Sequence, residues 1–188
     1  MFFSVMLILF SLVAAACAVL IPVICARADR LESLERLPRA RKPGMVLTAL
    51  VILWCVPNIE PILEPGSSLL NWLYPLAILS IGLCIYFLDY LFARALAAFL
   101  ILTAHYFLKE AFAARIYPFS AFLAAGLFLL GIAGILFGAK PYWFRDWIRL
   151  LFRDVRVRFG SALLLGYLAI TGFIVSAAVL SGGSGGSR

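Results

Sequence analysis

Seven polar residues lie where apolar segments end, and their side chains could bind a solute or move a proton. They are Asn58, Glu60, Glu64, Asn71, His105, Lys109 and Glu110. His105 and Lys109 stand four residues apart, so on a helix they share one face. Because ionisable groups near membrane depth are costly, they often line a solute or proton path. We predict a substrate-binding vestibule here. The alternative is that the charged residues are solvated loop residues and that His105 is a satisfied interior histidine.

A second group of candidate residues lies in the basic, aromatic segment 140–158. At 100° per residue one arc of a helix here would carry the polar side chains Arg145, Asp146, Arg149, Arg153 and Arg156. The opposite side would carry Trp143, Trp147, Leu150, Leu151 and Val155. We predict an amphipathic helix in the cytoplasmic interface, whose four arginines bind anionic phospholipid. The alternative is that the arginines only anchor the span that follows and set its orientation.

Signatures of catalysis and of metal binding are missing. The chain has one histidine, and its four cysteines fall singly, without the paired spacing of a zinc or redox site. It contains no Gly-x-Ser-x-Gly motif and no glycine loop for phosphate. We therefore predict no catalytic residue, no metal and no cofactor, and we expect a non-catalytic role ahead of an enzymatic one.

The composition indicates what positions these residues. The chain of 188 residues is 65% hydrophobic and 13% charged, with a mean hydropathy of +1.08. Globular proteins have roughly half apolar and a quarter charged residues, so a water-soluble fold is excluded. With about 20 apolar residues needed for each crossing, we predict an all-α integral membrane protein, a bundle of six transmembrane helices.

Breaker residues and charges divide the chain into six predicted spans. They are residues 3–26, 45–56, 69–88, 91–108, 119–137 and 161–180. The second span is expected to be short and to end at Val56, directly before Pro57, and the turn before the fourth is expected at Asp89, which would cap it. Residues 1–180 form one transmembrane domain. Residues 181–188 have the Gly/Ser composition of an engineered flexible linker.

The basic residues predict the orientation. Lys109 and Arg115 fall in loops on one side and Arg188 in the tail, whereas the other thirteen of the 16 Lys and Arg residues fall in loops on the opposite side. The positive-inside rule then places both termini outside, in a multi-pass protein of the bacterial inner membrane. The net charge of +7 is explained by this bias, so nucleic acid is not an expected partner.

Three functions fit these features. The leading hypothesis is a transporter or channel for a small solute or lipid-like molecule, with a cavity open toward Glu60, Asn71 and His105. The second is an accessory or scaffold subunit that packs against a membrane-protein partner or a second copy of the chain. The third is a lipid-modifying enzyme with Glu60 or Glu64 as general base and His105 as acid.

The Gly134-Ile-Leu-Phe-Gly138 pattern is expected to pack helices within the chain.

Overall fold

The computed structural model describes residues 2–26, 34–59, 68–113 and 119–182, and every regular element in these ranges is helical. In chain order the elements are α1 (Phe2–Cys25), the short 3-10 helix η2 (Leu37–Arg39), α3 (Arg41–Ile59), α4 (Ser68–Phe87), α5 (Leu91–Ala113), α6 (Phe119–Ala139), α7 (Pro141–Arg153) and α8 (Val155–Gly182). The predicted all-helical class is confirmed.

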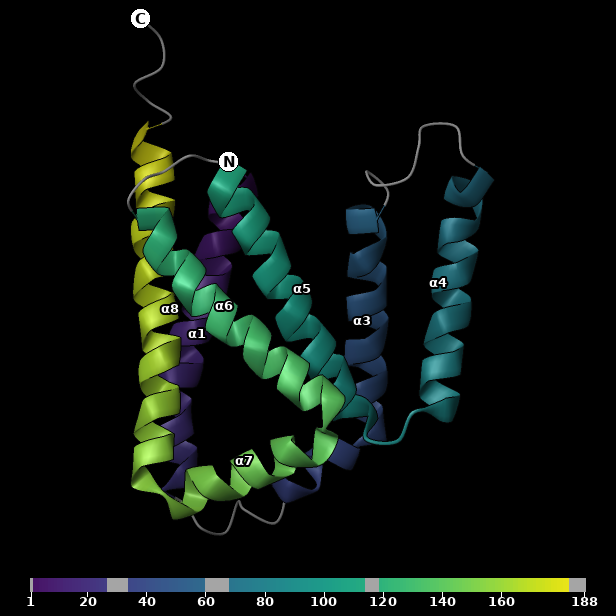
Figure 1. The fold of residues 1–188 in the computed structure, drawn as a ribbon, viewed down its shortest axis with the longest axis horizontal. Helices are drawn as coiled ribbons and strands as arrows, with labels where there is room; N and C mark the ends of the chain where they lie inside the picture. The colour runs from purple at the N-terminus through teal and green to yellow at the C-terminus, as the bar shows by residue number, and fades with distance from the viewer. Residues whose placement is uncertain (1, 27–33, 60–67, 114–118, 183–188) are drawn as a thin grey trace, which may run out of the picture.

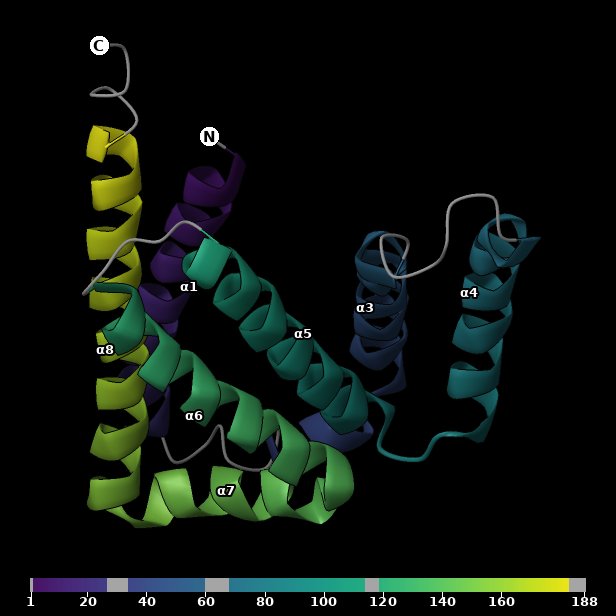
Figure 2. The ribbon, with the colours of Figure 1, turned by 45° about the horizontal axis from the view of Figure 1, so that its top comes forward.

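Six long helices alternate in direction, and the seventh, α7, runs across one end of the others (Figure 1). The start of α1 and the end of α8 lie at the opposite end, as the second view also shows (Figure 2). We call the end that α7 crosses the α7 end. In both views α3 stands between α5 and α4, so α4 is the outermost helix on that side.

The core lies where α1, α5, α6 and α8 meet. Leu7, Leu123, Leu127 and Leu168, one or two from each of three helices, are completely buried there, and Phe107 of α5 packs with them. The Tyr167 hydroxyl of α8 donates a hydrogen bond of 2.6 Å to the Phe122 main-chain oxygen of α6. These contacts tie the pair α1 and α8 to the pair α5 and α6.

Small residues allow the helices of each pair to approach closely. A Cβ added at Gly134 of α6 would lie 3.0 Å from the Ala97 carbonyl oxygen of α5, and one at Gly138 would lie 3.4 Å from the Ala97 Cβ. The prediction that these two glycines pack helices within the chain is therefore confirmed. Across the other pair, Gly172 of α8 faces the Ser11 hydroxyl of α1.

The outer surface is strongly apolar. Val19 of α1, Ile78 of α4, and Leu163 and Ile170 of α8 are each more than 60% exposed. Such an apolar exterior belongs in a lipid environment. By length and composition five helices, α1, α3, α5, α6 and α8, can cross a membrane, and the apolar stretch Trp72–Phe87 of α4 is shorter. The chain therefore has the helices of a multi-pass membrane protein.

The second predicted segment is longer than expected. The helix α3 begins at Arg41 and continues past Pro57 to Ile59, so the expected end at Val56 is wrong. Pro43 is the third helical residue, where the backbone N–H has no partner within the helix, so proline is tolerated there. Pro57 lies in the last turn and removes only one of the final hydrogen bonds.

The turn before α5 is at Asp89 and Tyr90, as expected. Asp89 is not the cap, however, because the first helical hydrogen bond of α5 runs from the Arg94 N–H to the Tyr90 carbonyl oxygen. Tyr90 has a φ of 56°, a left-handed conformation that reverses the chain between α4 and α5. The predicted cap is therefore wrong by one residue.

Candidate functional site

The seven residues of the predicted vestibule belong to α3, α4, α5 and the segment between α3 and α4. Glu60 and Glu64 lie outside the described residues, as does the side chain of Asn71. The Asn58 amide donates a 2.8 Å hydrogen bond to the Trp54 carbonyl oxygen of its own helix. His105 and Lys109 are exposed on α5, and Glu110 is half-buried. Three hollows formed by described residues lie at or near the α7 end instead, and none of these seven side chains lines them.

The most basic of these hollows is lined by four arginines and one carboxylate. Its volume is about 260 Å³, and its lining side chains are Glu35, Arg36, Arg39, Arg145 and Arg149. We call it the arginine hollow. The first three residues precede α3 and the other two lie on α7, so the fold brings together segments more than a hundred residues apart.

The proline-containing turn η2 positions Arg36 and Arg39. Pro38 is fully buried and forms its middle, and the Arg39 N–H donates to the Arg36 carbonyl oxygen at 3.1 Å. The Arg39 guanidinium donates a 2.6 Å hydrogen bond to the Tyr90 hydroxyl and lies 5.0 Å from the centre of the Tyr90 ring. The turn is thereby fixed against the start of α5, with Arg39 at the edge of the hollow.

The helix α7 holds Arg145 and Arg149 because its other face is anchored. Phe144, Ile148 and Leu151 are buried, and Phe144 and Ile148 pack with Ala93 of α5 in a second core cluster. At 100° per residue Arg145 and Arg149 lie about 100° or more around the helix from Phe144, beside this buried stripe. The arginines thus flank the core and face the hollow.

An ion pair joins the two segments. The Arg149 guanidinium donates two hydrogen bonds to the Glu35 carboxylate, from Nε to Oε1 at 3.0 Å and from Nη2 to Oε2 at 3.1 Å. The hydrogen bond from Arg149 lowers the pKa of Glu35 below its usual value, and the charges of Arg149 and Arg145 lower it further. The same pair raises the pKa of Arg149. Both groups are therefore charged at neutral pH.

The hollow retains unused capacity for an anion. The Arg145 Nε–H is buried and has no hydrogen-bond acceptor among the described residues, since the Asp146 carboxylate is 3.8 Å away. Four guanidinium groups face one carboxylate, which leaves a net charge of +3 on the lining. Guanidinium groups bind phosphate and carboxylate oxygens through paired N–H donors. The arrangement can bind an anionic group.

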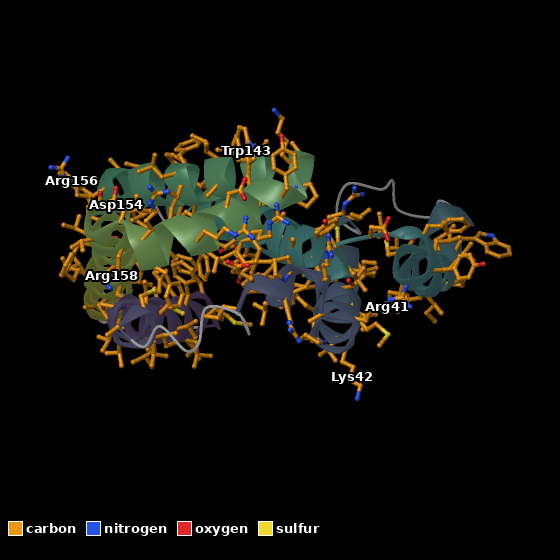
Figure 3. All side chains as sticks on the ribbon, turned by 90° about the horizontal axis from the view of Figure 1, so that it is seen from below. Arg41, Lys42, Trp143, Asp154, Arg156 and Arg158 are labelled. Carbon is orange, nitrogen blue, oxygen red and sulfur yellow. The ribbon has the colours of Figure 1, made fainter. Side chains whose placement is uncertain are left out.

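The predicted lipid-binding arginines separate into two sets. Arg145 and Arg149 line the hollow, whereas Arg153 is the exposed last residue of α7 and Arg156 belongs to α8. Seen from the α7 end, Arg156 projects from the outer edge of the molecule (Figure 3). The expectation that all four arginines share one face of one helix is therefore wrong, because α7 ends before Asp154.

Asp154 makes the corner between α7 and α8. Its backbone is extended (φ −113°, ψ 115°), and its carboxylate accepts a 2.9 Å hydrogen bond from the Arg156 N–H. Its carbonyl oxygen accepts from the Arg158 N–H at 3.2 Å, which is the first helical hydrogen bond of α8. Asp154 is thus the N-cap of α8. The sequence does contain a signal for this corner, because aspartate is a preferred N-cap residue. The helical spacing of the arginines on both sides of Asp154 obscured it.

The chain matches no protein-family model, no curated protein and no solved structure. In the part of the chain that the structure describes, no three His, Cys, Asp or Glu side chains gather in a way that could hold a metal ion. Arg36 and Arg39 are two of the thirteen basic residues that predict the orientation, and no local pattern marks Glu35. Their pairing with α7 depends on contacts that no local pattern shows.

Proposed function

We propose that this chain is a six-span membrane protein that binds an anionic, lipid-like molecule at the cytoplasmic ends of its helices. The first part rests on the six long helices, which alternate in direction and bring the start of α1 and the end of α8 to one end. In this arrangement α4 is the sixth span beside the five candidate helices. The strong excess of basic residues in the loops at the α7 end supports a cytoplasmic position for that end, with both termini outside.

The faces of α7 support a position in the membrane interface. Its buried stripe packs on the bundle, while Trp143 and Leu150, 38% and 46% exposed, form an apolar flank away from it. Trp143 points to the periphery of the molecule when it is viewed from the α7 end (Figure 3). Arg149 and Arg153 lie on the remaining face of α7 and are exposed. An interfacial helix distributes its side chains in this way.

The single observation that carries the binding function is the arginine hollow. Four arginines of two distant segments converge on one hollow of about 260 Å³, and a buried N–H of Arg145 has no acceptor there. At a cytoplasmic membrane surface, the abundant anions of matching geometry are lipid phosphates. We therefore infer that the hollow receives the headgroup of an anionic phospholipid or a similar amphiphile from the inner leaflet.

Handling of a lipid-like molecule by a carrier is the function that this binding site favours. Transport through the outer vestibule of Glu60, Asn71 and His105 stays a prediction, because two of those side chains lie outside the described residues. The enzymatic hypothesis depends on the same residues. The subunit hypothesis depends on a protein partner and makes no use of the hollow.

Two double variants with the same loss of charge test the binding function. Arg145→Gln with Arg149→Gln removes two arginines that line the hollow, and Arg153→Gln with Arg156→Gln removes two that do not. Native mass spectrometry of the full chain in detergent, titrated with phosphatidylglycerol or phosphatidylcholine, measures lipid binding. We expect the first variant to bind phosphatidylglycerol at least about tenfold more weakly, because each hydrogen bond to a charged group contributes about 1.5–3 kcal/mol. Equal effects of the two variants, or none, would refute the site.

A further inference from the structure

A second hollow near the α7 end is apolar and lies among three helices. It has a volume of about 120 Å³ and is lined by residues of α3, α4 and α5. We call it the α3–α4–α5 groove, and its lining residues are Thr48, Val51, Ile52, Cys84, Leu88, Leu91, Arg94, Ala95 and Ala98. All but Thr48 and Arg94 are apolar, so the walls suit a hydrocarbon chain. At roughly 30 Å³ for a group the size of water, about four methylene groups would fill it.

Close packing on one side and small side chains on the other maintain the groove. At the α7 end Gly44 lets α3 touch α5, since an added Cβ would lie 2.9 Å from the Phe92 nitrogen. Farther along, α5 presents only the methyl groups of Ala95 and Ala98 to the groove. The volume that larger side chains would fill is left open.

Two polar groups in the groove have unused hydrogen-bonding capacity. The Thr48 side chain is 6% exposed, and its buried Oγ1 has no hydrogen-bond partner among the described residues. A buried hydroxyl without a partner is unfavourable, so a ligand that supplies an acceptor would be bound in preference to hydrocarbon alone. The exposed Arg94 guanidinium has no ion pair or side-chain hydrogen bond within the described ranges. Together they offer a donor for a carbonyl and a charge for an anion.

The mouth of the groove opens toward a basic surface. A third hollow, of about 340 Å³, shares Leu88 and Leu91 with the groove and is lined further by Arg39, Arg41, Asp89 and Tyr90. Arg39 also lines the arginine hollow. Seen from the α7 end, Arg41 lies between α3 and α4, whereas Lys42 points away from them (Figure 3). An apolar slot therefore leads to a row of arginines.

We propose that the α3–α4–α5 groove binds the first part of an acyl chain of an anionic glycerophospholipid. Its ester carbonyl accepts a hydrogen bond from the Thr48 hydroxyl, and its phosphate extends past Arg94 and Arg41 toward Arg39, which lines both the third hollow and the arginine hollow. This inference rests on the proposed lipid-binding function and adds the acyl-chain site, which makes the ligand an amphiphile with an ester near its phosphate. A free phosphate or a soluble anion would not use the groove.

Thr48 has a matched control within the same chain. Thr103 of α5 is also buried, at 2% exposure, and its Oγ1 also lacks a partner, but it does not line the groove. We expect Thr48→Val to weaken phosphatidylglycerol binding by about fivefold, the equivalent of one hydrogen bond, and Thr103→Val to leave it unchanged. If the two variants weaken binding equally, the loss comes from removing a buried hydroxyl and not from a contact in the groove. That result would overturn the proposal.

A filling variant tests the groove without removing a polar group. Ala98→Phe should occupy the space of the acyl chain, whereas Ala125→Phe on the exposed face of α6 should not. With phosphatidylglycerol that carries a photoreactive group in its acyl chain, we expect wild-type crosslinks at 48–52 and 84–98. Ala98→Phe should abolish them and Ala125→Phe should keep them. Crosslinks that persist in Ala98→Phe would overturn the proposal.

The outcomes separate this inference from the function on which it rests. Loss of binding in the Arg145/Arg149 double variant together with normal binding in Thr48→Val and Ala98→Phe would leave headgroup binding intact and refute the groove. Normal binding in the arginine double variant with loss in both groove variants would refute the arginine hollow as the headgroup site. Loss in all three supports both.

Discussion

Among single residues, Glu35 is the only acidic side chain that lines the arginine hollow in the described part of the chain. Its carboxylate occupies the paired N–H donors of Arg149, the donors that a lipid phosphate would also use. Glu35 thus joins the two arginine segments and at the same time competes with an anionic ligand. These two roles make opposite predictions for its removal.

We expect Glu35→Gln to increase binding of phosphatidylglycerol severalfold. The amide oxygen still accepts one hydrogen bond from Arg149, while the net charge of the lining rises from +3 to +4. A residue that served only to hold the segments together would give weaker binding when changed. The lipid titration that compares the arginine variants measures this directly, and Glu35→Asp, which keeps the charge, is the control.

The lowered pKa of Glu35 gives an independent check by pH. The ion pair with Arg149 contributes above the ordinary carboxyl pKa of 4.5 and is lost as the pH falls through the lowered pKa. Protonation then removes the competing charge, so a lipid whose headgroup stays ionised, such as a sulfolipid, should bind more tightly there. The increase should be absent in Glu35→Gln. If the wild type alone bound the sulfolipid more weakly at low pH, the Glu35 carboxylate would not compete with the headgroup for Arg149.

The helical spacing predicts that Arg145 and Arg149 share one face of a helix, but it does not indicate their partners. The helical spacing in 140–153 reveals a polar face, and that face does hold both residues. Arg149 and Glu35 are 114 positions apart, and nothing in the local pattern of either segment indicates the other. The same pattern also included Arg156, because the helical spacing of polar residues continues through Asp154. The helix itself does not, since α7 ends at Arg153 and α8 begins at Val155.

Among the elements, the helices were predicted more reliably than their ends. All six predicted spans coincide with a long helix, and α5 and α6 begin at the predicted residues Leu91 and Phe119. The ends of α3 differ because the predicted span was defined by its apolar residues, whereas the helix includes Arg41 and Lys42. The helix α8 starts six residues early and has 28 residues, about 42 Å, so its first turns carry Arg156 and Arg158 beyond a hydrocarbon core of about 30 Å.

Close packing of α1 against α8 depends on Gly172. An added Cβ there would collide with the Ser11 hydroxyl, which is already bonded to the Leu7 carbonyl oxygen at 2.7 Å. We expect Gly172→Ala to lower the free energy of unfolding by about 1–3 kcal/mol through overpacking, measured by unfolding in a mixed-detergent titration.

The matched control lies on the same helix. A Cβ at Gly166 of α8 would meet nothing within 4 Å, so Gly166→Ala should leave the stability unchanged or raise it slightly. Equal losses of stability in the two variants would mean that glycine acts through the helix backbone and not through its contact with α1.

For the whole molecule, the two ends of the bundle have different chemistry. The α7 end carries the three hollows, and the basic residues Arg39, Arg94 and Arg149 line one or two of them each. The exposed His105 and Lys109 lie on α5 toward its other end. The thirteen-to-two distribution of basic residues predicts that the α7 end is cytoplasmic. It did not predict that these residues would line hollows, because that depends on how α3, α5 and α7 pack.

Photocrosslinking in membranes is the most direct test of the central claim that the arginine hollow binds an anionic headgroup. Proteoliposomes of the full chain would contain phosphatidylglycerol or phosphatidylcholine with a photoreactive group on the headgroup, and the labelled peptides would be mapped by mass spectrometry. The account predicts labelling of residues 34–39 and 145–149 by phosphatidylglycerol, greatly reduced with phosphatidylcholine. Equal labelling by both lipids, or labelling confined to the region of Arg153 and Arg156, would contradict it.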